Sequence, residues 1–253
     1  MSDLDLKGRG ILVTRAAHQA DGLVERIQTG QGRAIRFPAL EILACEQPGP
    51  VRDLLQRSWD MIIFVSPNAV FHALKLLAGN RLQATLGAVG EATAAALRQS
   101  GYSIDLLPAD RYDSEGLLML APLQEMTGQK VLIVRGEGGR ALLGEGLQAR
   151  GAEVGYAEVY RRVRPAVDPY PLLAQWQEQV DLVTVTSIEV MENLIALVGD
   201  SGWPLLQHTP LLVISERMLR HAESRGFQTV LLAAGANDDA IMSAIQNWVE
   251  PTS

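Results

Sequence analysis

Hydroxyl, glycine and arginine residues follow several short apolar runs of this chain, and they are its candidates for chemistry. Ser66 follows the run Met61–Val65 and precedes a proline, and Ser187 follows Leu182–Thr186. Serine with a proline after it is typical of a helix start, so plain helix capping is one interpretation. Free N–H groups and a hydroxyl at a helix start also bind anions, and this second interpretation is compatible with the first. Thr93 has the same two interpretations.

Arg15 and Arg135 each end an apolar run. The fork of N–H donors on an arginine suits a carboxylate or a phosphate, and the alternative is a solvated arginine. The stretch RGEGGR, residues 135–140, resembles a phosphate loop only loosely. It lacks the Gly-Lys-Ser/Thr ending of a P-loop and is not GxGxxG.

Tyr160 lies in an extended segment and is the one candidate acid. Its phenol can donate a hydrogen bond or assist a departing group, and the alternative is a packed aromatic ring. The four histidines are scattered without metal spacing, and the single cysteine, Cys45, cannot build a zinc cluster or an internal disulfide. We therefore expect no metal, no redox centre, and chemistry that rests on binding and positioning.

The elements that must position these residues alternate between short apolar runs and amphipathic stretches. This order predicts parallel sheets with helical crossovers, whose ligands bind at the carboxyl ends of the strands. Helices are expected over Asn68–Ala78, Glu91–Gln99 and Glu216–Ser224. Strands are expected at Ile11–Thr14, Ala34–Phe37, Met61–Val65, Leu86–Val89, Ile104–Leu107, Val131–Val134, Glu153–Tyr156, Leu182–Thr186, Leu211–Ile214 and Thr229–Leu232.

The chain contains an internal sequence repeat of two copies. Four blocks of the first half recur in the same order in the second half, which indicates a duplication with two lobes. The segments 38–43 and 157–163 occupy equivalent positions in the halves, and nearby prolines disfavour helix there. We expect them to be connecting strands, a hinge between the lobes. The matched blocks are Gly8–Arg15 with Gly128–Arg135, Trp59–Ser66 with Val180–Ser187, Leu86–Glu91 with Leu211–Glu216, and Ser100–Ile104 with Arg225–Thr229.

Composition limits the function classes. The 253 residues are 47% hydrophobic and 20% charged with a net charge of −7, as in a globular protein with a real core. No basic block stands out, so nucleic acid is not an expected partner. No apolar run approaches the roughly 20 residues of a membrane span, and no signal peptide is recognisable. We expect a cytoplasmic protein without a membrane partner.

The blocks ILVTR, FVSPNAV, AVGEAT, LIVRGEGGR, AEVYRR and VTVTS together resemble the bacterial uroporphyrinogen-III synthase family. The resemblance implies an α/β fold of two doubly wound, flavodoxin-like parallel-sheet lobes joined by a two-stranded connector. It implies lobes at 1–37 plus 164–253 and at 44–156, with the site in the cleft between them. The second lobe departs at VTSIEV, which lacks the Ser-Pro pair of FVSPNAV.

The resemblance also implies a reaction. The substrate would be hydroxymethylbilane, a linear polycarboxylate tetrapyrrole, which loses its hydroxyl to give an azafulvene. Attack at the substituted carbon of ring D would give a spiro intermediate, which reopens and recloses as uroporphyrinogen III. No cofactor is implied. We expect a monomer, with transient contact to the enzyme that makes hydroxymethylbilane.

The expected site roles follow partly from the same resemblance and partly from the positions of residues at strand ends. Tyr160 is expected to assist loss of the hydroxyl. The residues expected to bind substrate are Arg15, Ser66, Pro67, Asn68, Gly90, Thr93, Arg135, Gly136, Arg140, Thr186 and Ser187. Two other functions stay open from the residues alone. One is a duplicated small-molecule receptor without turnover, and the other is a transferase that handles nucleotide sugars or phosphate through RGEGGR.

Overall fold

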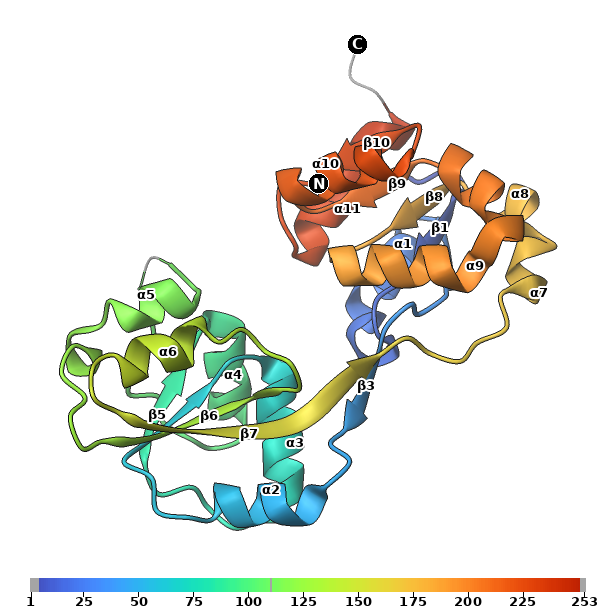
Figure 1. Ribbon diagram of the computed structural model, residues 1–253. Helices are drawn as coiled ribbons and strands as arrows, with labels where there is room; N and C mark the ends of the chain where they lie inside the picture. Colours follow the sequence, from blue (N-terminus) through green and yellow to red (C-terminus); the bar gives the residue numbers. More distant parts are fainter. Residues whose placement is uncertain (1–4, 110, 251–253) are drawn as a thin grey trace. The chain divides into compact units, whose positions relative to one another are not determined.

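The computed structural model describes residues 5–109 and 111–250, and the chain divides into two compact units (Figure 1). Unit 1 combines the segment up to Glu41 with the segment from Val163 onward, and unit 2 is Ile42–Arg162. Each unit is built on a five-stranded sheet. Within the described ranges, no helix has the length and apolar character to cross a membrane.

The sheet of unit 1 has the order β10-β9-β8-β1-β2, and its strands pair in parallel. In chain order this is the 2-1-3-4-5 arrangement of flavodoxin-like sheets. Its central strands are short apolar runs without an exposed residue, as expected for strands covered on both faces. The strands are β1 (Gly10–Val13), β2 (Arg33–Arg36), β8 (Leu182–Thr184), β9 (Leu211–Val213) and β10 (Val230–Leu232).

Helices cover both faces of this sheet. Ile11 and Val13 face α1 (Asp21–Thr29) and α11 (Asp238–Val249), whereas Leu12 faces the other side. That side packs against α8 (Trp176–Gln179), α9 (Ile188–His208) and α10 (Glu216–Arg225). The remaining short helices of unit 1 are η1 (Ala17–Gln19) and α7 (Tyr170–Leu173).

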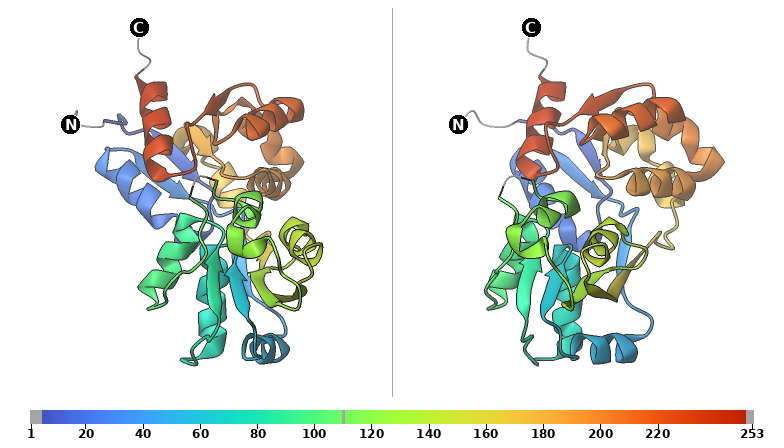
Figure 2. Two further views of the ribbon diagram at one scale, coloured as in Figure 1. Left: turned by 90° about the vertical axis from the view of Figure 1, so that its left-hand side faces the viewer. Right: turned by 60° about the vertical axis from the view of Figure 1, so that its left-hand side comes forward.

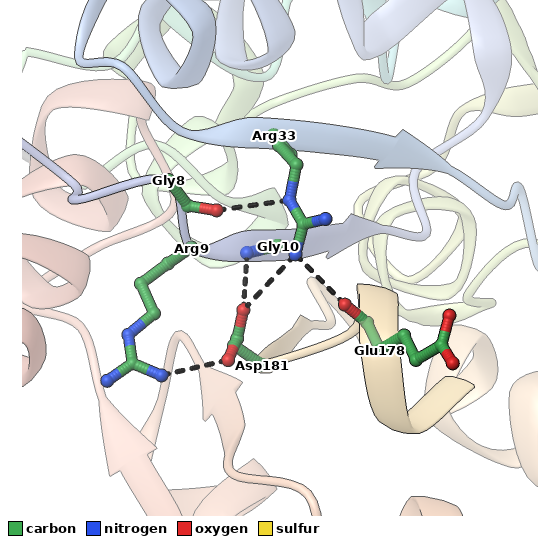
Figure 3. A network of polar contacts seen from close by, with 6 residues as sticks. All are labelled: Gly8, Arg9, Gly10, Arg33, Glu178 and Asp181. Atoms are coloured by element: carbon green, nitrogen blue, oxygen red, sulfur yellow. Dashed lines mark hydrogen bonds and ion pairs between the residues drawn. The ribbon is translucent and has the colours of Figure 1, made fainter. Parts of the chain in front are cut away.

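Asp181 ties together the amino ends of three strands of this sheet (Figure 3). Its carboxylate accepts hydrogen bonds from the Gly10 N–H at 2.7 Å and from the Arg9 guanidinium at 2.9 Å, and Arg33 lies 3.8 Å away. Gly10 must be glycine because a Cβ there would lie 1.6 Å from the Gln179 carbonyl oxygen. This network therefore closes the sheet at the end opposite to the expected ligand edge.

The sheet of unit 2 has the order β3-β7-β6-β4-β5. The pairs β7·β6, β6·β4 and β4·β5 are parallel. The strands are β3 (Glu41–Ala44), β4 (Met61–Phe64), β5 (Thr85–Ala88), β6 (Lys130–Gly136) and β7 (Glu153–Val163).

Helices cover both faces of this sheet too, and Figure 2 shows α4 and α6 on opposite sides of its strands. Ile62 and Phe64 pack with helices on one face, and Met61 and Ile63 pack with helices on the other. The first face carries α2 (Pro48–Leu55), α3 (Pro67–Leu77) and α4 (Glu91–Gln99). The second carries α5 (Ser114–Leu118), η2 (Ala121–Leu123) and α6 (Leu142–Gln148).

Most of the expected elements are present, and the α/β fold with two parallel sheets is confirmed. One expected strand is wrong, because 104–107 contributes only a single bridge between Gly87 and Leu106. The Asp105 carboxylate accepts the Leu86 N–H at 2.8 Å and so takes a donor that a regular ladder would use. The expected strand 153–156 and connecting segment 157–163 form one continuous strand, β7, which neighbours β3 in the sheet.

Candidate active site

A cavity of about 270 Å³ lies at the carboxyl edge of the unit 2 sheet. We name it the arginine cavity, because Arg135, Arg140 and Arg162 line it. Ser66, Gly136 and Tyr160 complete the part of the wall that the sequence pointed to. The other lining residues are Val65, Val89, Ser114, Ile133, Gly139 and Leu143. No acidic side chain is among these lining residues, so the cavity suits an anionic group.

Ser66 is placed at this edge by the start of α3. Its Oγ accepts a hydrogen bond from the Ala69 N–H at 3.1 Å, and Pro67 occupies the first turn. The capping interpretation is therefore confirmed. The same Oγ lies 3.2 Å from the Oη of Tyr160, and either hydroxyl can donate. This contact joins two residues that are 94 positions apart in the sequence.

Tyr160 stands on β7 and is 5% exposed. It also lines a second cavity of about 260 Å³, which we name the glutamate cavity after Glu46, Glu137 and Glu158 in its wall. Cys45 lines the glutamate cavity too, and burial raises the pKa of its thiol. A thiol with a raised pKa carries little thiolate at neutral pH, so it is a poor nucleophile there.

Arg135 is fixed by contacts on several sides. Its guanidinium pairs with Glu158 at 2.9 Å, donates to the Gly139 carbonyl at 3.0 Å and lies 4.1 Å from the centre of the Tyr156 ring. Its side chain is 15% exposed, and its buried Nε has no hydrogen-bond partner among the described residues. An arginine held in this way presents a rigid donor surface to a bound carboxylate.

The structure does not bring all the expected binding residues to this cavity. Asn68 is half-buried on α3, Gly90 precedes α4, and Thr93 on α4 is only 3% exposed. None of the three, nor the exposed Pro67, is part of the described wall of the arginine cavity.

Three expected residues belong to unit 1. Ser187 caps α9 by accepting the Val190 N–H at 3.0 Å, and Thr186 is half-buried before it. Arg15 pairs with Asp238 and donates to the Ala236 carbonyl at 3.1 Å, with a side chain 12% exposed. Arg15 is therefore engaged within unit 1, as Arg135 is engaged within unit 2.

Sequence reasoning missed Arg162 and Ser114, and it named Gly139 only as part of the stretch RGEGGR. Arg162 stands two positions after Tyr160 on β7, and side chains two apart on a strand share a face, so a strand pattern could have indicated it. Ser114 begins α5, whose cap Asp113 accepts the Gly116 N–H at 2.7 Å. Across the residues described, no group of histidine, cysteine and acidic side chains could hold a metal ion.

Comparison with known proteins decides the family. The profile described as uroporphyrinogen-III synthase HemD matches residues 21–243. The chain belongs to the uroporphyrinogen-III synthase family. Uroporphyrinogen-III synthase of Escherichia coli K12 is 38% identical over 247 residues, which cover 93% of this chain and 99% of that protein. The Salmonella typhimurium LT2 enzyme is 35% identical with the same coverage.

Solved structures agree on the fold. A mutant uroporphyrinogen III synthase from Thermus thermophilus superposes with a TM-score of 0.62 at 15% identity, covering 96% of this chain and 100% of that one. The Helicobacter pylori 26695 enzyme also gives 0.62, at 16% identity, covering 93% of this chain and 97% of that one. The uroporphyrinogen-III synthase family consists of lyases of porphyrin and haem biosynthesis. As a member of it, this chain is an enzyme, a lyase, and not the receptor or the sugar transferase that the residues alone left open.

Proposed function

We propose that this chain converts hydroxymethylbilane to uroporphyrinogen III, and that Tyr160 in the arginine cavity assists loss of the hydroxyl. The observation that carries the proposal is the 3.2 Å contact between the Tyr160 and Ser66 hydroxyls beside three arginines. A proton donor and a set of cations then line one small cavity at a sheet edge where parallel α/β proteins bind ligands.

The first step needs a proton donor. The C–O bond of the hydroxymethyl group breaks while the pyrrole nitrogen lone pair forms a C=N bond, and the nitrogen then loses its proton to solvent to leave the neutral azafulvene. The Tyr160 Oη donates its proton to the departing oxygen, which leaves as water. The Ser66 hydroxyl lies close enough to donate to the phenolate oxygen that results. Ser66 is itself oriented by the Ala69 N–H, so this donor is held in place before the reaction.

The remaining steps depend more on how the substrate is held than on a proton donor. The substituted carbon of ring D attacks the azafulvene carbon to give the spiro intermediate, which fragments and recloses with ring D inverted. The final loss of a ring proton restores the aromatic pyrrole. Because the substrate also closes spontaneously to the other isomer, the protein must favour one folded arrangement of the chain. Arg135, Arg140 and Arg162 are the proposed carboxylate partners that fix it.

Product analysis tests the proposal. The protein would be given hydroxymethylbilane, and the products would be oxidised and resolved as isomers. We expect isomer III to dominate. Formation of isomer I alone, at the rate seen without protein, would contradict the proposed function.

The role of Tyr160 has its own test. Tyr160→Phe keeps the ring and removes the proton donor, so we expect isomer III formation to slow by about 100-fold or more. Tyr102→Phe is the matched control, because Tyr102 contacts Arg81 elsewhere in unit 2, and it should keep the full rate. An undiminished rate in Tyr160→Phe would remove the proposed acid.

A further inference from the structure

The Tyr160 ring lies so close to one backbone position that only glycine fits there without displacing the ring. A Cβ on Gly136 would lie 2.6 Å from both Cε2 and Cζ of the Tyr160 ring and 3.0 Å from its Oη. Real Cβ atoms do not approach other atoms this closely. Gly136 is not among the residues with a positive φ, so space rather than backbone conformation requires glycine here.

An irregularity in strand pairing sets this contact. Arg135 of β6 stands opposite Glu158 of β7, but the next residue, Gly136, stands opposite Tyr160. Val159 is the extra residue of this shift, and its carbonyl accepts the Cys45 N–H at 3.2 Å. Bulges of this kind re-aim a side chain next to active sites. The shift therefore puts the tyrosine, and not the valine, against the glycine.

His72 contacts the same ring. The ring centres of His72 and Tyr160 are 5.7 Å apart with planes at 30°, and Phe71 packs edge-on to the histidine at 5.2 Å. His72 lies on α3, the helix that Ser66 begins. One helix therefore supplies a contact to the phenol oxygen and a contact to the ring, while β6 supplies the glycine.

We propose that Gly136 and His72 are positioning residues that hold the Tyr160 ring so that its hydroxyl stays at Ser66. This inference rests on the proposed function, because the position of the phenol affects the reaction only if Tyr160 is the proton donor. The geometry of the ring can nevertheless be measured without any turnover.

Proton NMR of the histidine rings measures the stacking of Tyr160 on His72. The chain has four histidines, so their ring signals can be assigned with a His72→Phe variant. We expect the part of the His72 ring-current shift that comes from Tyr160 to persist in Tyr160→Phe and to be lost in Tyr160→Leu, while the part from Phe71 remains. Gly136→Ala should move the signal because it displaces the ring. An unmoved signal in Gly136→Ala would overturn the role of the glycine.

Steady-state kinetics measure how the position of the ring affects turnover. Gly136→Ala should lower kcat by about 100-fold, the loss expected from a displacement near 1 Å, with little change in KM. In a Tyr160→Leu background the same change should cost almost nothing further, because the ring it displaces is gone. His72→Phe keeps a stacking ring and should retain kcat, whereas His72→Ala should lower it.

Two glycine variants serve as controls. Gly49→Ala adds a methyl group that meets nothing within 4 Å, and it should leave kcat and KM unchanged. Gly139→Ala places its methyl 3.0 Å from the Arg135 side chain, so it should raise KM more than it lowers kcat.

The outcomes separate the two proposals. If Gly136→Ala costs kcat equally with and without the tyrosine ring, the glycine is merely structural and the positioning role is overturned. If the wild-type protein makes no isomer III, the proposed function fails, while the NMR shifts still report the ring contact. If wild type makes isomer III and Gly136→Ala equals it, only the positioning role fails.

Discussion

At the residue scale, Arg135 makes three contacts within unit 2 and is also a proposed partner of a substrate carboxylate. Its contacts to Glu158, the Gly139 carbonyl and the Tyr156 ring hold both the guanidinium and the loop that follows β6. A lysine has one compact ammonium group and cannot make all three contacts at once. Substitution of Arg135 by lysine therefore loses contacts even though it preserves the positive charge.

We expect Arg135→Lys to raise KM for hydroxymethylbilane by about 10-fold, the effect of losing one hydrogen bond to a charged group. The change in kcat should be smaller, since Tyr160 and Ser66 stay in contact. Arg81→Lys is the matched control, because Arg81 also lies over a tyrosine ring, that of Tyr102, and donates to a backbone carbonyl. Steady-state kinetics check both variants, and an equal KM in Arg135→Lys and wild type would contradict the assignment.

At this scale the sequence predicted local interactions, such as a helix cap, better than it predicted which residues contact one another across the fold. The Ser66-Pro67 pair is enough to predict a cap, because capping is a local interaction. Arg15 and Arg135 have equivalent places in the repeat, yet Arg15 pairs with Asp238 on α11 and Arg135 lines a cavity. That difference depends on residues remote in the chain, so no strand-end pattern could have shown it.

At the element scale, α5 depends on its cap. It has five residues, and a helix this short is marginal unless packing and capping support it. Leu117 and Leu118 supply the packing, since both are buried in the core beneath the sheet. Asp113 supplies the cap: the Gly116 N–H, together with Arg111, holds the pKa of its carboxyl below its ordinary value.

The lowered pKa gives a pH dependence with a definite sign. A carboxyl with a depressed pKa in the folded state contributes stability above its ordinary pKa of 3.8, and this is lost as the pH falls through the folded value. Asp113→Ala should therefore be less stable than wild type at neutral pH, with the difference shrinking in acid below pH 3.8. Urea unfolding of both proteins at neutral pH and below pH 3.8 measures the difference in the free energy of unfolding. Asp53→Ala on the exposed face of α2 should show no such change, and a constant difference for Asp113→Ala would contradict the cap.

Elements were predictable where the apolar runs were regular. The helix expected at Glu91–Gln99 has those bounds in α4, because its apolar spacing is local information. The run Ile104–Leu107 has the same apolar character, but its position beside β5 yields a single bridge. The bulge in β7 was equally invisible, because pairing register depends on the neighbouring strand.

At the scale of the whole molecule, the sequence repeat and the sheets divide the chain differently. The sheet of unit 1 joins β1 and β2 of the first repeat to β8, β9 and β10 of the second. The sheet of unit 2 joins β4 and β5 of the first repeat to β6 and β7 of the second. Repeat-equivalent strands take the same places in the two sheets, since β2-β1-β8-β9 corresponds to β7-β6-β4-β5. Each sheet is therefore complete only when both repeats contribute.

This arrangement predicts which fragment of the chain can fold alone. Residues 41–163 contain all five strands of the unit 2 sheet and the hydrophobic clusters on both of its faces. Residues 1–127 follow the repeat instead and contain β1 and β2 without β8, and β4 and β5 without β6. Because apolar strand faces must be covered by their own sheet and helices, we expect only the first fragment to unfold cooperatively and to give dispersed amide NMR signals. A cooperative 1–127 fragment together with a disordered 41–163 fragment would show that the repeat, and not the sheet, is the folding unit.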